Sequence, residues 1–233
     1  FCASLGVFSS TSVTAVTVEA FLKKIPRRYK YIDIYLNHQN MFSIADFPMT
    51  ERVNYILPLN RSYEEIANDY RTNLKRNIKK GEQSGLIVQK NIELNEILAL
   101  AGETMQRVSA ISDEQLNRFR NVYESAKKYK QAELIGIYSA TNQLLASAVF
   151  LFSHNRWYYI LVGNHPNGKT LGASHYLIDR FIHQHAGTET LLDFEGSDIR
   201  NLAFFYSSYG AAEERYPALR MNRLPKLLKW LKE

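Results

Sequence analysis

Hydrophobic residues recur along this chain in two patterns: short runs and alternations of strand length, and repeats every three to four residues that are typical of amphipathic helices. Together the two patterns predict a mixed α/β protein. From Leu86 the expected order is strand, helix, helix, three strands, helix, strand, helix and strand. The expected strands span 86–90, 133–138, 144–152, 157–162, 190–194 and part of 213–221. The expected helices span 94–108, 113–129, 170–185 and 199–209.

The first part of the chain holds fewer elements. Strands are expected at 3–8, 31–36 and 52–59, with one helix at 13–25 that Pro26 ends. Three strands and one helix are too few for a complete domain. We therefore predict an incomplete domain at 1–61, a connecting helix at 62–85 and a larger domain at 86–233.

The predicted connecting helix is amphipathic and basic. Ser62 is a suitable N-cap, and Gly85 is a suitable end. The second half of the helix, residues 71–80, holds five cations, while an apolar stripe is expected to face inward. This basic face has two interpretations: a solvated surface, or a surface that contacts the phosphates of a nucleotide or of RNA.

Composition limits the partners and the compartment. The chain has 233 residues, 45% of them hydrophobic, and a formal net charge of +6, which favours a phosphorylated cofactor, RNA or an acidic surface as partner. No apolar run approaches the roughly 18 residues that cross a bilayer, so we expect no membrane span. A single cysteine, Cys2, fits the reducing cytoplasm. Because residue 1 is Phe, we expect the sequence to begin inside a longer protein.

Candidate chemistry gathers after the strand expected at 190–194. Two carboxylates, Asp193 and Glu195, stand at its end, and the following helix carries Tyr206. A carboxylate and a phenol that face one cleft can move a proton on and off a small substrate. Asp193 is expected to be buried against a basic neighbour, which leaves Glu195 and Tyr206 as the candidate catalytic residues. The alternatives are a Glu195 that caps the next helix or pairs with Arg200, and a Tyr206 that belongs to the core.

Three histidines stand in or near the helix expected at 170–185, namely His175, His183 and His185. His183 and His185 are two residues apart, so on a helix they point to different faces. The spacing of four residues that brings two histidines onto one metal ion is missing. We therefore expect no metal centre.

The order of elements over residues 86–222 resembles the GNAT acyltransferase fold. In that family a helix opens with a Q/R-x-x-G-x-G/A motif, whose backbone N–H groups hold the pyrophosphate of coenzyme A. The matching stretch here is Lys169-Thr-Leu-Gly172-Ala-Ser174, in which Lys replaces Gln or Arg and Ser replaces the last Gly or Ala. The resemblance therefore implies acetyl-CoA or another acyl-CoA as donor. The residues that it implies in donor binding are Val162, Gly163, Lys169, Gly172, Ala173 and Ser174.

Tyr206 stands four residues before Gly210, a spacing that is also found in many GNAT enzymes. In the family this tyrosine often protonates the leaving thiolate. Ordinary phenol and thiol pKa values lie only about 1.5 units apart, so such a transfer would be nearly balanced. The resemblance implies direct attack by a substrate amine, with Glu195 accepting the amine proton and backbone N–H groups near Val162 and Gly163 stabilising the oxyanion.

Three further stretches resemble a bacterial FemAB-like group, whose members carry two GNAT-like domains in tandem. The stretches are residues 5–9 (LGVFS), 70–80 (YRTNLKRNIKK) and 193–197 (DFEGS). On this likeness, residues 1–61 are the back half of a first GNAT-like domain. FemAB proteins use aminoacyl-tRNA as donor and extend the bridge peptides of peptidoglycan.

Three functions therefore stay open. The first is transfer of an acyl group from acyl-CoA to an amine of a small molecule or peptide. The second is an aminoacyl-tRNA-dependent transfer to a cell-wall precursor, with tRNA as partner. The third is a binding module that keeps the fold but has lost the donor site. An incomplete first domain would also leave an open edge strand, which favours a homodimer.

Overall fold

The computed structural model describes residues 5–90, 92–106, 112–196, 198–225, 227–228 and 230. The chain divides into two compact units. Unit 1 comprises mainly Tyr55–Glu195 and Asn201–Ala212, and unit 2 comprises Cys2–Asn54, Gly196–Arg200 and Glu213–Glu233. Unit 2 combines segments from both ends of the chain. The domain boundaries at residues 61 and 85, and the correspondence of residues 1–61 to part of a first GNAT-like domain, stay predictions.

Eight strands are hydrogen-bonded in the order β1-β8-β2-β7-β6-β5-β4-β3 in the part of the chain that the structure describes. From β3 to β6 neighbours are antiparallel, β6 and β7 are parallel, and β7 is antiparallel to β2. This mixed sheet, flanked by helices, confirms the predicted fold class. The strands in unit 1 are the end of β2 (Met49–Pro58), β3 (Ile87–Gln89), β4 (Ala132–Tyr138), β5 (Leu144–Ser153), β6 (Arg156–Asn164) and β7 (Leu191–Asp193).

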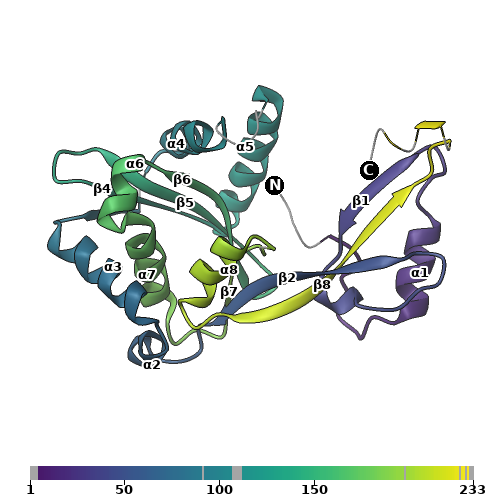
Figure 1. Ribbon diagram of the computed structural model, residues 1–233, viewed down its shortest axis with the longest axis horizontal. Helices are drawn as coiled ribbons and strands as arrows, with labels where there is room; N and C mark the ends of the chain where they lie inside the picture. Colours follow the sequence, from purple (N-terminus) through teal and green to yellow (C-terminus); the bar gives the residue numbers. More distant parts are fainter. Residues whose placement is uncertain are drawn as a thin grey trace. The chain divides into compact units, whose positions relative to one another are not determined.

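Helices cover both faces of the sheet in unit 1 (Figure 1). On one face, α4 (Leu94–Gln106) and α5 (Asp113–Lys128) enclose a core that includes Ile97, Phe119 and Leu161. On the other face, α7 (Ala173–His185) packs on β4 and β5, where Phe181 stacks on Phe150 with ring centroids 3.8 Å apart. α3 (Thr72–Gln83) packs against α7. No helix within the described ranges is long and apolar enough to cross a membrane.

The helix expected at 62–85 is in fact two helices, α2 (Tyr63–Asn68) and α3. Ser62 caps α2 as predicted. The break falls at Arg71, whose backbone is extended. There the Arg71 N–H donates to the Ser208 carbonyl at 2.9 Å, and its guanidinium lies 4.8 Å from the centre of the Phe204 ring. Both partners belong to α8 (Arg200–Ser207) or its end, so a distant contact interrupts a locally continuous helical pattern.

Unit 2 contains α1 (Ala15–Lys23), the short 3₁₀ helix η1 (His38–Asn40), β1 (Tyr31–Tyr35), the start of β2 and most of β8 (Ala212–Asn222). β1 and β8 are antiparallel, with Tyr31 opposite Asn222. The core of unit 2 includes Val18, Leu22, Ile32, Leu36 and Leu219. Of the strand expected at 3–8, residues 3 and 4 lie outside the described residues, and Leu5 forms a single parallel bridge with Leu36.

Candidate functional site

β6 and β7 separate after three paired residues. The last pair is Tyr158 with Asp193, whereas β6 continues along β5 as far as Asn164, which pairs with Ala146. From Tyr159 onward, the edge of β6 that faced β7 is therefore unpaired by any strand in the described residues. Such an edge presents N–H and C=O groups that can bind a ligand.

Val162 and Gly163 lie along this open edge. Successive residues of a strand direct their N–H groups to opposite edges, so one of the two presents its N–H to the opening. The register between β5 and β6 also shifts, because Val149 pairs with Leu161 but Phe150 pairs with Tyr159. This bulge re-aims the backbone just before the predicted oxyanion donors.

Asp193 confirms the predicted burial against a basic neighbour. Its side chain is 1% exposed, and its Oδ2 accepts a hydrogen bond from Arg156 Nη1 at 3.0 Å. Its Oδ1 accepts the backbone N–H of Glu195 at 2.8 Å. Glu195 has a left-handed backbone with φ 63°, and it is half-buried. The buried ion pair therefore anchors the turn that carries the candidate base.

Tyr206 lies in α8, and its ring stacks on Phe194 with centroids 4.7 Å apart. The residue is only 8% exposed. Burial, and secondly the nearby negative charge of Glu195, raises the pKa of Tyr206 to about 12. Glu195 is thus within electrostatic range of Tyr206, and Phe194, the residue just before Glu195, stacks on the Tyr206 ring where β7 ends.

The raised pKa of Tyr206 corrects one expectation. At about 12, this pKa lies roughly 3.5 units above that of an ordinary thiol. Full transfer of the phenol proton to a thiolate is therefore uphill rather than nearly balanced. The buried phenol stays protonated at neutral pH and is better suited to donate a hydrogen bond than to give up its proton.

Tyr159 is a further residue of this site that the sequence did not single out. It is the first β6 residue beyond the last pair with β7, and its ring lies 6.3 Å from that of Phe194. Burial raises the pKa of Tyr159 well above its ordinary value, and the neighbouring Tyr206 adds to this effect. In the sequence, Tyr159 is one of several aromatic residues of a strand and carries no signal of its own.

The predicted pyrophosphate motif has a different local structure from the one expected. A short helix, α6 (Pro166–Leu171), lies between β6 and α7, where the sequence predicted no element before residue 170. Pro166 occupies its first turn, and His165 caps it by accepting the N–H of Asn167. Lys169 therefore lies within α6, where it is exposed. Gly172, with φ 72°, joins α6 to α7.

The start of α7 is partly enclosed. Gly172 and Ala173 are buried, and Ser174 Oγ donates a hydrogen bond to Asn164 Oδ1. The turn also lies close to α3, since a Cβ added at Gly172 would stand 2.6 Å from the Asn77 carbonyl oxygen. Of the predicted phosphate contacts, Lys169 is the most accessible, and Ser174 already has a protein partner.

We expect Gly172→Ala to be more destabilising than an ordinary substitution at positive φ. A left-handed backbone costs a non-Gly residue about 1–2 kcal/mol, and the new methyl group would also press on the Asn77 backbone. Gly85→Ala is the matched control, because Gly85 has φ 66° but nothing within 4 Å of the added Cβ. Urea unfolding of both variants measures the difference; equal losses would contradict a tight contact between α3 and this turn.

The histidines occupy unrelated environments. Burial lowers the pKa of His175 to about 4, and its ring makes an edge contact with Phe205 at 4.9 Å. His185 lies 3.1 Å from a carboxylate oxygen of Glu133. Within the described residues, no three His, Cys, Asp or Glu side chains gather where they could hold a metal ion.

Comparison with known proteins identifies the family. A family model described as "Acetyltransferase (GNAT) domain" matches residues 68–198, which is more than half of the chain. The chain belongs to the GNAT acetyltransferase family. The matched range of this GNAT domain begins in α2, includes the separating strands β6 and β7 and ends beyond Glu195, whereas Tyr206 lies outside it.

Solved structures with the same fold extend the likeness beyond the matched range. "Crystal structure of FemX" has a TM-score of 0.62 at 13% identity and covers 94% of this chain and 80% of FemX. "The structure of L-PGS from Bacillus licheniformis" has a TM-score of 0.56 at 12% identity, with 91% and 74% covered. A GCN5-related N-acetyltransferase from Sphaerobacter thermophilus has a TM-score of 0.51 at 8% identity, with 90% and 65% covered.

At these identities the likeness concerns the fold, and it fits the FemAB-like subgroup that the sequence motifs resemble. The comparison with curated proteins produced no match.

Proposed function

We propose that this GNAT protein transfers an acyl group from acyl-CoA to the amine of a small molecule or peptide. The observation that carries the proposal is the separation of β6 from β7 after Tyr158 and Asp193, with Glu195 and Tyr206 beside the point of separation. An acyl carrier that enters between the strands would meet backbone donors of β6 on one side and the side chains of Glu195 and Tyr206 on the other. Acyl-CoA is a cytoplasmic metabolite, so the proposal keeps the cytoplasm as compartment.

In the proposed reaction, the amine nitrogen attacks the thioester carbonyl carbon. An N–H from Val162 or Gly163 would stabilise the developing oxyanion. Glu195 would accept the proton that the amine loses, and the C–S bond would then break. Tyr206 would donate a hydrogen bond to the departing thiolate, which would take its proton finally from solvent. Orientation of the two substrates would supply much of the rate.

The donor can be tested by calorimetry with acetyl-CoA and longer acyl-CoAs. We expect heat of binding, and we expect Lys169→Glu to weaken binding by about tenfold, because an exposed cation beside the start of α7 would be replaced by an anion. Lys128→Glu is the matched control. It makes the same change of charge at the end of α5, distant in sequence from the motif, and it should bind acyl-CoA normally. No heat with any acyl-CoA would overturn the proposed donor.

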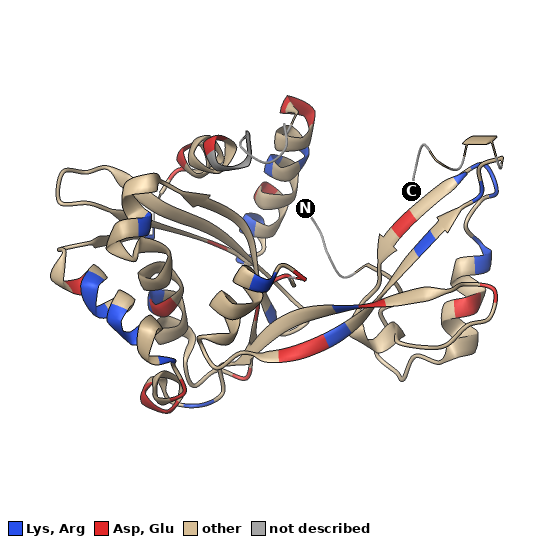
Figure 2. Cartoon of the chain, viewed as in Figure 1, with Lys and Arg blue, Asp and Glu red and all other residues tan. Residues whose placement is uncertain are grey.

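A second candidate is transfer from aminoacyl-tRNA to a cell-wall precursor. Its specific support is α3, where Arg76, Lys79 and Lys80 are exposed along one helix (Figure 2). Three adjacent cations can neutralise phosphates of an RNA backbone. A gel shift with charged tRNA tests this candidate: charge reversal at Arg76 and Lys79 should abolish the shift, and unchanged affinity would count against it. Failure of both donors would favour a binding module without activity.

Tyr206→Phe should lower kcat by about ten- to a hundredfold through the loss of one hydrogen-bond donor. Because the pKa of Tyr206 is about 12, the wild-type phenol is protonated throughout the usual assay range. The ratio of wild-type to variant kcat should therefore be the same at pH 7 and pH 9. A ratio that falls as the pH rises over this range would contradict a buried, protonated Tyr206.

A further inference from the structure

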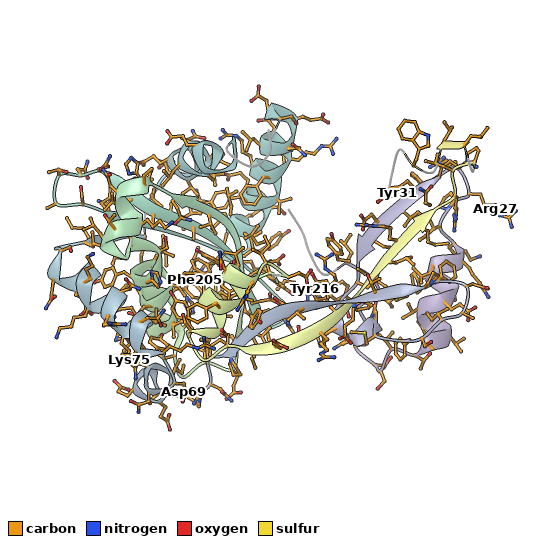
Figure 3. The ribbon with its side chains drawn as sticks, viewed as in Figure 1. Arg27, Tyr31, Asp69, Lys75, Phe205 and Tyr216 are labelled. Carbon is orange, nitrogen blue, oxygen red and sulfur yellow. The ribbon has the colours of Figure 1, made fainter. Side chains whose placement is uncertain are left out.

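One end of unit 2 gathers cations from two segments that are distant in sequence. The loop between α1 and β1 leads to Tyr31, which pairs with Asn222 at the end of β8. Directly beyond this pair, the Arg223 N–H donates to the Lys30 carbonyl at 2.6 Å. The two segments therefore lie side by side. Figure 3 labels Arg27 and Tyr31, which belong to the first of these segments. We call this end the basic tip; its cations are Lys24, Arg27, Arg28, Lys30 and Arg223.

The cations of the basic tip have no acidic partner among the described residues, while nearby cations do. Lys23 pairs with Glu19 at 2.6 Å, and Arg220 pairs with Asp33 at 3.0 Å. Glu19 of α1 and Asp33 of β1 are therefore paired with cations that do not belong to the tip. Figure 2 shows the resulting run of Lys and Arg in the loop between α1 and β1. Lys24, Arg27, Arg28 and Lys30 are exposed, so their positive charge can meet an anionic partner, whereas Arg223 is partly buried.

Large apolar side chains are exposed in, or just after, the same two segments of the chain. Tyr29 is 49% exposed, and shortly after Arg223 the chain exposes 87% of Leu227 and 70% of Trp230. Leu228 is also exposed. On the surface of a soluble protein, large apolar side chains are normally scattered singly, and a group of them marks an interaction site. The arrangement combines Tyr, Trp and leucines with a row of cations.

We propose that the basic tip docks on the surface of an anionic lipid bilayer. Cations next to lipid phosphates, aromatic rings at headgroup depth and leucines in the acyl boundary are the combination that binds a membrane interface. Each cation close to such a surface raises partitioning about fivefold. The leucines decide against RNA as the main partner, because aliphatic side chains neither stack on bases as rings do nor neutralise phosphates. This docking is independent of the proposed acyl transfer.

Co-sedimentation of the full chain with vesicles tests the proposal. We expect binding to vesicles of phosphatidylcholine mixed with phosphatidylglycerol, weaker binding to phosphatidylcholine alone, and a fall in binding as salt increases. The double variant Arg27→Glu with Arg28→Glu should bind more than tenfold more weakly, because it reverses two charges at the tip. The double variant Leu227→Ser with Trp230→Ala should also bind vesicles more weakly. Its residual binding should be mostly lost at higher salt.

The matched control is Arg76→Glu with Lys79→Glu, which changes the net charge equally but on α3 of unit 1. This control should keep vesicle binding. Because the substituted positions are exposed, we expect every variant to fold. Unfolding midpoints equal to that of the wild type would verify this. Absence of binding to anionic vesicles would overturn the proposal. A loss of vesicle binding in the α3 control equal to that in the Arg27→Glu, Arg28→Glu variant would also overturn it, because net charge alone would then explain binding. Loss of tRNA binding rather than vesicle binding in the tip variant would identify a nucleic-acid surface instead.

Discussion

Glu195→Gln should lower kcat for acyl transfer by about 10²–10⁴, the range in which a positioned general base contributes. The substitution keeps the size of the side chain but removes its ability to accept a proton. The backbone of Glu195 is held by the hydrogen bond from its N–H to Asp193, so the amide should occupy the same place as the carboxylate. Stability and donor binding should change little. Steady-state kinetics with the accepted donor and a panel of amines measures the effect.

Glu189→Gln is the matched control, since it makes the same chemical change at an exposed site before β7. Its kcat should equal that of the wild type. If Glu195→Gln also kept full kcat, Glu195 would not be the base, and the role would fall to another group or to water. A loss of kcat with an unchanged unfolding midpoint would support the assignment directly.

Asp193→Ala should lower the free energy of unfolding by about 3–5 kcal/mol. The Asp193 side chain is 1% exposed and its partner Arg156 is 11% exposed, so the substitution leaves a buried guanidinium without its carboxylate. The second oxygen of Asp193 also holds the turn at Glu195. The variant should therefore lose activity as well as stability. Chemical denaturation and kinetics on the same preparation measure both.

Asp33→Ala provides the comparison for this prediction. Asp33 also pairs with an arginine at 3.0 Å, but that arginine, Arg220, is 57% exposed. Water can solvate Arg220 when the carboxylate is removed, so the expected loss is about 1 kcal/mol or less. Losses of similar size in the two variants would contradict the argument that burial of the arginine makes the loss of its carboxylate costly.

Stability should also depend on Tyr206 at high pH. The folded pKa of about 12 lies above the ordinary value near 10, so the folded state retains the phenol proton more strongly than the unfolded state. The resulting stabilisation is present below pH 10 and is lost as the pH rises from 10 towards 12. This loss should be smaller in Tyr206→Phe.

Much of the candidate site follows from local patterns. The apolar run before Asp193 indicated a buried strand, and the position of Glu195 just beyond it indicated a strand end. The spacing of Tyr206 and Gly210 placed the phenol in the next helix. In contrast, the broken helix at Arg71 and the short helix α6 were missed. Arg71 is held by Ser208, from the far end of the chain, and α6 depends on a histidine cap that composition does not reveal.

The sequence by itself determined most of the order of strands and helices, because periodicity, caps and spacing are properties of neighbouring residues. Its motifs also carried the GNAT resemblance and the choice of Glu195 and Tyr206 as candidates. Only the tertiary structure decided where β7 leaves β6, which partner buries Asp193 and how far burial shifts the pKa of Tyr206. These features depend on contacts between residues far apart in the chain. Burial and electrostatic fields are sums over such contacts, and no window of sequence contains them.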